Sequence, residues 1–120
     1  MARRASRLYR QNFCSNTANN MEKEYSQTER QRLFKGLCDE MSQLHEVKDA
    51  DYNGAYEESL DEFGLIHAAA MLKHKVNRFK NIVETKKINV SGESMKDTLL
   101  DLASYAIMTA AWLDFHNKDV

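Results

Sequence analysis

Proline is absent from this 120-residue chain, and glycine occurs only four times. Strand-rich folds need many tight turns, which these two residues normally supply. Their scarcity argues against such folds and favours a few long helices joined by short loops. A chain of this length forms one domain, in which about two thirds of the unfolded surface becomes buried around a single core.

Cysteine is also scarce, with only Cys14 and Cys38 in the chain. Two cysteines make no disulfide framework, so we expect a reducing, cytoplasmic compartment. The longest apolar run, "LASYAIMTAAWL", has 12 residues. A membrane span needs about 20 such residues, so this run predicts a buried helix and no membrane association.

The net charge is only −1, which implies no general attraction to nucleic acid. The charge is unevenly distributed, because the first 20 residues carry four arginines and no acid. The remainder has 13 basic against 18 acidic residues, a net charge of −5, which suits a cation-binding protein. We interpret residues 1–25 as a basic, polar tail and residues 26–120 as the domain. The tail could instead lie upstream of a true start at Met21, be a transit-like peptide, or form an arm that touches nucleic acid.

Apolar residues at helical spacing predict three or four helices. The first begins at Ser26 or Thr28, with Thr28 as its N-cap, and fades near Lys48. Its apolar positions are Leu33, Phe34, Leu37, Cys38, Met41 and Leu44. The second follows Gly54 and extends to Val83, and Gly64 bends it or divides it in two.

The last helix is predicted from Met95 to about Phe115. Ser94 and Asp97 have the spacing of a capping box at its start. Before it, Ile88 and Val90 alternate with polar residues, which would suit a very short strand. The expected inner face consists of Leu99, Leu102, Ala106, Thr109, Ala110 and Leu113. The prediction is an all-α helical bundle of three to four helices, and because no helix can bury its apolar stripe alone, a dimer would complete the core.

Two groups of acids could carry chemistry. One contains Glu57, Glu58, Asp61 and Glu62, and the other contains Asp97 and Asp101. Residues three or four apart share a helix face, where like charges repel unless a cation lies between them. Mg²⁺ accepts a few carboxylates and completes its shell with water and phosphates. The alternative, favoured by spacing alone, is a set of solvated surface acids with Asp97 as a helix cap.

A basic cluster, "KHKVNRFKN", follows the first acidic group. Lys75 and Arg78 share one helix face and could bind phosphate, although an ordinary polar face would look the same. Several aromatic side chains could stack on a base, but such residues more often fill cores, as we expect for Trp112. The remaining candidates are Tyr52, Tyr56 and Tyr105.

Three blocks of the sequence resemble, in order, those of the nucleotide modification associated domain family, which are small and often phage-encoded proteins. The blocks are "KDADYNGAYEESLDEFG", "LKHKVNRFKNIV" and "ESMKDTLLDLASYAIM", and they span about Lys48 to Trp112. The last block is the most specific, because amphipathicity alone does not produce "DTLLDLASYA". The chain departs from the expected pattern at Gly54, which comes one residue late, and at His74, Thr98 and Ser104.

The resemblance implies a MazG-like helical bundle, similar to the all-α nucleoside triphosphate pyrophosphohydrolases and dimeric dUTPases. It also implies Mg²⁺ as cofactor, a nucleotide as ligand and a homodimer or higher homo-oligomer. The implied metal ligands are Glu58, Glu62, Asp97 and Asp101. The implied catalytic residues are Glu58 and Asp61, and the implied phosphate-binding residues are Lys75 and Arg78. With such a ligand, Tyr52 and Tyr105 are expected to contact the base.

Two functions follow as hypotheses. In the first, the protein hydrolyses a nucleoside or deoxynucleoside triphosphate to the monophosphate and pyrophosphate, with Mg²⁺ making hydroxide accessible near neutral pH. In the second, the same site binds a nucleotide without turnover, as a sequestering protein or as an accessory to nucleotide or DNA modification. A third possibility is a purely structural helical dimer.

Overall fold

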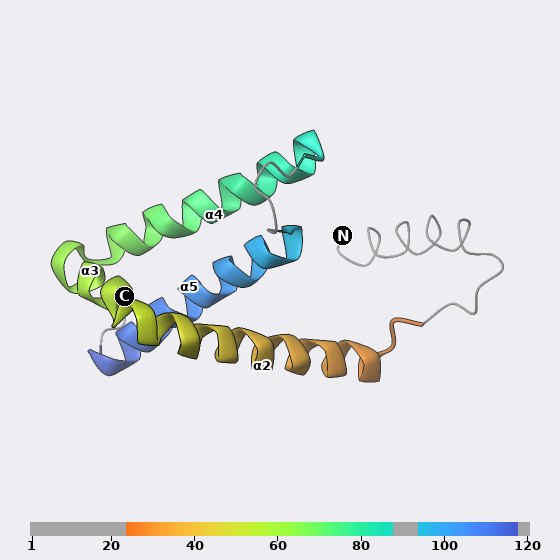
Figure 1. The fold of residues 1–120 in the computed structure, drawn as a ribbon, viewed down its shortest axis with the longest axis horizontal. Helices are drawn as coiled ribbons and strands as arrows, with labels where there is room; N and C mark the ends of the chain where they lie inside the picture. Colours follow the sequence, from red (N-terminus) through yellow and green to blue (C-terminus); the bar gives the residue numbers. More distant parts are fainter. Residues whose placement is uncertain (1–23, 88–93, 118–120) are drawn as a thin grey trace. The chain divides into compact units, whose positions relative to one another are not determined.

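The structure is a computed structural model that describes residues 24–87 and 94–117. Within these ranges the chain forms four helices and no strand, which confirms the all-α class: α2 (Gln27–Tyr52), α3 (Ala55–Phe63), α4 (Leu65–Thr85) and α5 (Met95–Phe115). Figure 1 shows their order along the chain. Most of the predicted tail and the possible strand at Ile88–Val90 lie outside the described residues. The chain divides into two units, one up to Leu37 and one from Cys38 onward.

The first unit contributes the start of α2. The Ser26 hydroxyl oxygen accepts a hydrogen bond from the backbone N–H of Glu29 at 3.2 Å. Ser26, rather than Thr28, therefore satisfies one of the free N–H groups at the start of this helix. Apart from Gly36, all the residues described in the following paragraphs belong to the second unit.

Helix α2 ends four residues later than the sequence predicts, at Tyr52 instead of near Lys48. Asn53 and Gly54 both have positive φ, at 50° and 71°, and the Asn53 N–H still donates to the carbonyl of Asp49 at 2.7 Å. This left-handed backbone is a common way to end a helix, and asparagine and glycine tolerate it best. The polar stretch before it remains helical, so the extra turn carries Lys48 and Tyr52 on a regular helix.

Gly64 divides the next predicted helix into α3 and α4, as the sequence allows. Its φ of 76° and ψ of −167° lie in a region that only glycine adopts readily. The Gly64 N–H caps α3 by donating to the carbonyl of Leu60 at 2.8 Å, and α4 begins at the next residue.

Helices α4 and α5 are antiparallel neighbours and form the main helix pair of the second unit (Figure 1). Near the start of α4 a small core gathers Leu60 of α3, Ala68 of α4 and Trp112 of α5. Tyr56, Leu65 and Leu113 pack against it. Trp112 is buried, as predicted, and Ile82 is buried further along α4.

The predicted inner face of α5 is wrong for three residues. Leu99 is 41% exposed, and Ala106 and Ala110 are also exposed. The side of α5 that faces α4 instead carries Thr98, which is fully buried, and Trp112. The periodicity of the sequence could not select this side, because the run from Leu102 to Leu113 is apolar almost all round the helix.

The predicted capping box at the start of α5 is confirmed. The Ser94 hydroxyl oxygen accepts from the Asp97 N–H at 3.1 Å, and the Asp97 carboxylate accepts from the Ser94 N–H at 2.8 Å. Across the described part of the chain, no helix is long and apolar enough to cross a membrane.

We expect Gly64→Ala to lower the free energy of unfolding by about 1–3 kcal/mol. A Cβ at Gly64 would meet no atom within 4 Å, so the loss would come from the backbone conformation alone. Gly36→Ala is the matched control: Gly36 lies inside α2, also has open space around its Cβ, and should gain up to about 1 kcal/mol. Urea unfolding at one protein concentration measures both. A Gly64→Ala protein as stable as the parent would contradict the conformational role of this glycine.

Candidate functional site

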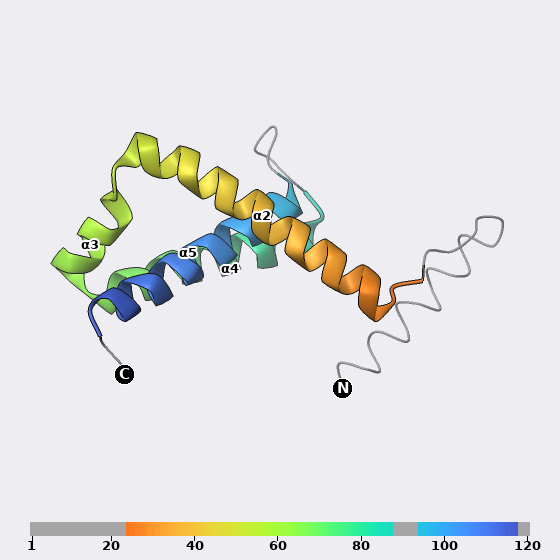
Figure 2. The same ribbon diagram turned by 90° about the horizontal axis from the view of Figure 1, so that it is seen from below.

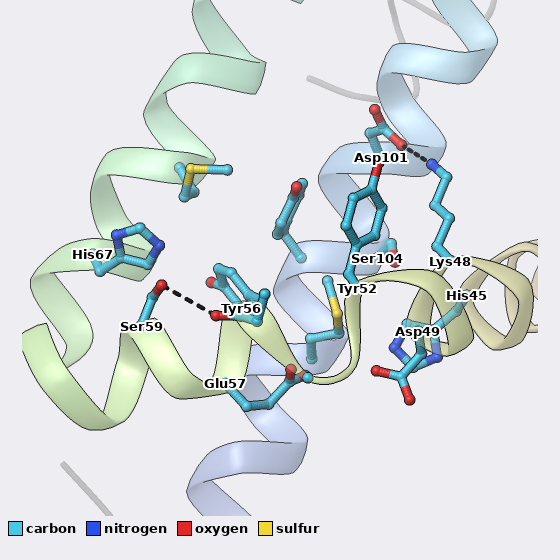
Figure 3. Close-up of a pocket in the computed structure, with 15 residues that line it drawn as sticks. His45, Lys48, Asp49, Tyr52, Tyr56, Glu57, Ser59, His67, Asp101 and Ser104 are labelled. Atoms are coloured by element: carbon cyan, nitrogen blue, oxygen red, sulfur yellow. Dashed lines mark hydrogen bonds and ion pairs between the residues drawn. The ribbon is translucent and has the colours of Figure 1, made fainter.

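A pocket of about 380 Å³ opens where the last turns of α2 meet α3, α4 and α5 (Figure 3). Pockets that bind small ligands start at roughly 300 Å³, so this one can hold a small organic molecule. Each of the four helices contributes to its wall. The lining residues include His45, Lys48, Asp49, Tyr52, Tyr56, Glu57, His67, Asp101 and Tyr105.

Tyrosine rings form one side of the pocket. The rings of Tyr56 and Tyr105 meet edge to face, with centroids 4.9 Å apart, and the His67 ring lies 5.7 Å from Tyr56. Tyr52 also lines the pocket but is 68% exposed, which places it at the rim. These rings offer flat apolar surface with polar edges, a suitable contact for a planar heterocycle.

The Tyr56 hydroxyl is fixed by a short chain of hydrogen bonds. Thr109 donates its hydroxyl proton to the carbonyl of Tyr105 at 2.7 Å, so at 2.8 Å the Tyr56 hydroxyl must donate to the Thr109 oxygen. Burial raises the pKa of Tyr56 above its ordinary value, although the hydrogen bond to Thr109 partly opposes this. Tyr56 is therefore neutral at physiological pH and holds one ring orientation.

Asp101 forms the charged side of the pocket and joins three helices. Its carboxylate lies 3.4 Å from Lys48 Nζ of α2 and 3.3 Å from Lys75 Nζ of α4, and Figure 3 shows the first of these ion pairs. Lys75 Nζ also lies 5.8 Å from the centre of the Tyr105 ring, within the range of a cation–π contact. A half-exposed lysine such as Lys48 gains little from its ion pair, so an anionic ligand can recruit it at small cost.

His45 adds a polar group that the protein leaves unsatisfied. Its Nε2 atom is buried, yet within the described chain no hydrogen-bond partner reaches it. An unpaired buried polar atom destabilises the protein by about 1–3 kcal/mol unless water or a ligand satisfies it. Since His45 lines the pocket, a bound molecule is one way to provide that partner.

The structure brings together several of the residues predicted from the sequence. Asp101, Tyr52, Tyr56 and Tyr105 line the pocket, and Lys75 is bound to Asp101. Arg78 does not line it; its Nε donates to the hydroxyl oxygen of Thr98 at 3.2 Å. Thr98 is one of the positions where the chain departs from the family pattern, and here it is a buried partner of Arg78.

The other predicted acids lie outside the pocket wall. Glu58 and Glu62 are exposed. Asp61 accepts a hydrogen bond from Trp112 Nε1 at 2.9 Å and lies 3.6 Å from His116 Nε2. Asp97 takes part in the capping box. From the first acidic group it is Glu57 that lines the pocket.

The carboxylates do not form a metal site from protein atoms alone. In residues 24–87 and 94–117, no three His, Cys, Asp or Glu side chains come close enough to hold an ion together. Mg²⁺ that arrives with a nucleotide needs only one or two carboxylates, because phosphates and water supply its other ligands. Asp101 lines the pocket and fits that smaller requirement; Glu57 and Asp49 also line the pocket, at its other end (Figure 3).

Sequence reasoning missed His45, Lys48 and Asp49. Because the prediction ended the first helix near Lys48, it did not treat the residues around this end as positions on one helix face. The available signal was spacing: together with Tyr52 these residues recur at intervals of three and four, which places them on one face of a helix that continues to Tyr52.

These features define an all-α domain with a ligand-sized pocket whose walls carry tyrosines and a carboxylate between two lysines. Residues 48–113, more than half of the chain, match the sequence profile of the nucleotide modification associated domain 1 family, and the chain belongs to that family. The matched segment contains all the pocket residues except His45. Comparisons with curated proteins and with solved structures gave no match.

The capping role of Asp97 predicts that the stability of the folded protein depends on pH. Hydrogen bonds from the backbone and hydroxyl of Ser94 lower the pKa of Asp97 in the folded protein. The stability that these bonds contribute is therefore present above the ordinary carboxyl pKa of about 3.9, and it is lost as pH falls through the lowered folded value.

We expect Asp97→Ala to be less stable than the parent at pH 6, with the difference shrinking below about pH 3.9. Asp114→Ala, at the opposite end of the same helix, is the control and should not be destabilised at pH 6, because an acid is unfavourable near a helix C-terminus. Urea midpoints measured across this pH range test the expectation. A difference that stayed constant down to pH 2 would contradict it.

Proposed function

We propose that the pocket binds a nucleoside triphosphate as its Mg²⁺ complex. One observation carries the proposal: a ligand-sized pocket combines tyrosine rings with the Asp101 carboxylate, which pairs with Lys48 of the pocket wall and with the adjacent Lys75. Membership of a family associated with nucleotide modification supports the same ligand class. A cytoplasmic setting, where such nucleotides are plentiful, fits the proposal.

In the proposed complex the base lies among the rings. Tyr56 and Tyr105 contribute their ring edges and faces, and Tyr52 covers the base from the rim. His45 Nε2 gains a hydrogen bond from a polar group of the ligand. Stacking on an aromatic side chain contributes about 1–3 kcal/mol per base, enough to matter for a small ligand.

The phosphates take the charged side. Without a ligand, Lys48 and Lys75 share the single negative charge of Asp101, whereas a triphosphate carries several negative charges. Each lysine can exchange one weak ion pair for a charge-assisted hydrogen bond to phosphate oxygen. Asp101 would then hold the Mg²⁺ of the complex, and the metal would supply neutralisation of phosphate charge.

Hydrolysis to the monophosphate and pyrophosphate is the second step of the proposal. The oxygen of a water forms a bond to the α-phosphorus, the bond from that phosphorus to the bridging oxygen breaks, and pyrophosphate leaves with the electron pair. A carboxylate must accept the proton of the attacking water. Glu57 lines the pocket, whereas Glu58 is exposed and Asp61 is engaged by Trp112, so we assign this role to Glu57.

The central test combines binding with product detection. Titration calorimetry with a panel of ribo- and deoxyribonucleoside triphosphates, with and without Mg²⁺, should identify at least one ligand that binds more tightly with the metal. Asp101→Asn should remove that Mg²⁺-dependent gain, by about tenfold or more, and leave the fold intact, while the control Asp114→Asn should keep it. The proposal fails if no nucleotide binds, or if Asp101→Asn retains the full effect of the metal.

The same panel separates the two functions when pyrophosphate is measured over time. Release of pyrophosphate that Glu57→Gln abolishes without loss of binding would establish hydrolysis with the assigned residue. Binding across the panel without any pyrophosphate would instead establish the non-catalytic function, a sequestering or accessory protein.

A lysine pair on α4 provides a matched test of the phosphate site. Lys75 contacts the pocket-lining Asp101, whereas Lys73, two residues earlier, is exposed. We expect Lys75→Ala to weaken triphosphate binding by about tenfold and Lys73→Ala to change it less than twofold. Equal effects of the two substitutions would mean that general electrostatic attraction, not this site, binds the nucleotide.

A further inference from the structure

The α4–α5 pair has two sides that differ in what covers them. The pocket lies on one side (Figure 3). The part of α2 from residue 38 onward lies on the same side (Figure 2). Met71 of α4 and Asp101, Tyr105 and Met108 of α5 belong to this side. Successive residues of a helix are rotated by about 100°, so the residues that directly follow Met71, Asp101 and Tyr105 point away from the pocket.

Those following residues belong to an apolar stripe on each helix. The stripe of α4 consists of Ala69, Leu72, Val76, Phe79 and Val83, and that of α5 consists of Met95, Leu99, Leu102, Ala106 and Ala110. The spacing is three or four throughout, and no charged residue interrupts either stripe.

The antiparallel register brings the two stripes to the same face. Lys75 contacts Asp101 and Arg78 contacts Thr98, so three steps forward along α4 correspond to three steps back along α5. Continuing this register sets Val83 beside the start of α5 at Met95, Val76 between Leu99 and Leu102, and Ala69 between Ala106 and Ala110. We call the ten residues of the two stripes the open face.

The open face is only partly covered within the described chain. Val76 and Val83 are 47% and 48% exposed, and Met95 and Leu99 are 37% and 41% exposed. Only four apolar residues of the described chain are buried, and just one of them, Ile82, lies toward the far end of this helix pair. A chain of 120 residues ordinarily buries a much larger core, so the open face is core surface that lacks its second layer.

We infer that a second copy of this chain covers the open face, and that the two α4–α5 pairs pack together as a four-helix core. Its size matches a specific dimer. Two 21-residue helices side by side make a face about 30 Å long and 20 Å wide, roughly 600 Å². A stable interface needs about 600–1,000 Å² from each partner.

The composition of the open face also favours a copy of itself over a different protein. It runs the length of both helices and carries no charge, as expected of an obligate homodimer, whose interface resembles a domain core cut in half. The alanines Ala69, Ala106 and Ala110 gather at one end of the face, and larger side chains such as Phe79 and Leu99 lie toward the other end. Under a two-fold axis each patch meets the same patch of its copy, so large residues can pack over small ones.

Sedimentation velocity of the full chain tests this inference without any ligand. The expected mass is twice the 13.9 kDa of one chain at micromolar concentrations, and the melting temperature should rise with protein concentration. A mass of one chain up to about 100 μM would overturn the proposal, since an interface of this size should hold well below that concentration.

Two matched substitutions locate the interface. Val76→Glu places a charge on the open face, whereas Ile107→Glu places one at a similarly exposed apolar residue, 54% against 47%, that lies outside both stripes. We expect Val76→Glu to be monomeric or unfolded and Ile107→Glu to remain dimeric. A dimeric Val76→Glu, or loss of the dimer in both variants, would overturn the assignment of this face.

If Val76→Glu does not fold, the isosteric Val76→Thr decides the question. It should raise the dimer dissociation constant by about tenfold or more, because each copy buries a polar hydroxyl in place of a methyl group. Ile107→Thr is its control and should leave the constant unchanged. None of these measurements uses a nucleotide, so the inference can fail independently of the proposed function.

Discussion

The constraint on which the structure depends is that α5 must be covered on every side. Between Asp101 and Asp114 this helix carries no charged residue, and a helix that is apolar all round is stable only when buried. Helix α4 covers the side with Thr98 and Trp112. The last turns of α2 approach a second side of α5, where Asp101 lines the pocket and pairs with Lys48 of α2. The described chain does not cover the third side, and a second copy of the chain would cover it.

The pocket follows from the same arrangement. Helices α2, α3 and α4 converge on the apolar helix α5 and cannot fill all the space between them. The turn at Asn53 and Gly54 directs the chain around that space instead of across it. Tyrosines can line such a gap because they bury a ring and keep a polar end for a partner, as Tyr56 does with Thr109. Asp101 is tolerated there because two lysines from different helices compensate its charge.

The sequence predicted the class of fold well, because helix boundaries are local: Gly64 and the Ser94–Asp97 capping box each act within one turn. It predicted the site only in part. Spacing along one helix shows that Glu58 and Glu62 share a face, but not whether that face points inward, and both are exposed. Lys48 and Asp101 are 53 residues apart in sequence, and only the tertiary packing brings them together. The prediction of the inner face of α5 was wrong for a related reason. Periodicity indicates which residues need burial, but it does not show which part of this chain, or which other chain, buries them.

Helix α5 therefore lines the pocket with one side and contributes to the open face with another. Asp101 and Tyr105 face the pocket, while the residues that follow them, Leu102 and Ala106, belong to the open face. A second copy on the open face would leave the pocket mouth accessible, since pocket and open face lie on opposite sides of the helix pair. It would also fix α5 from behind, and the orientation of Asp101 toward Lys48 and Lys75 depends on how firmly α5 is held. Dimerisation in this arrangement stabilises the site without contributing a residue to it.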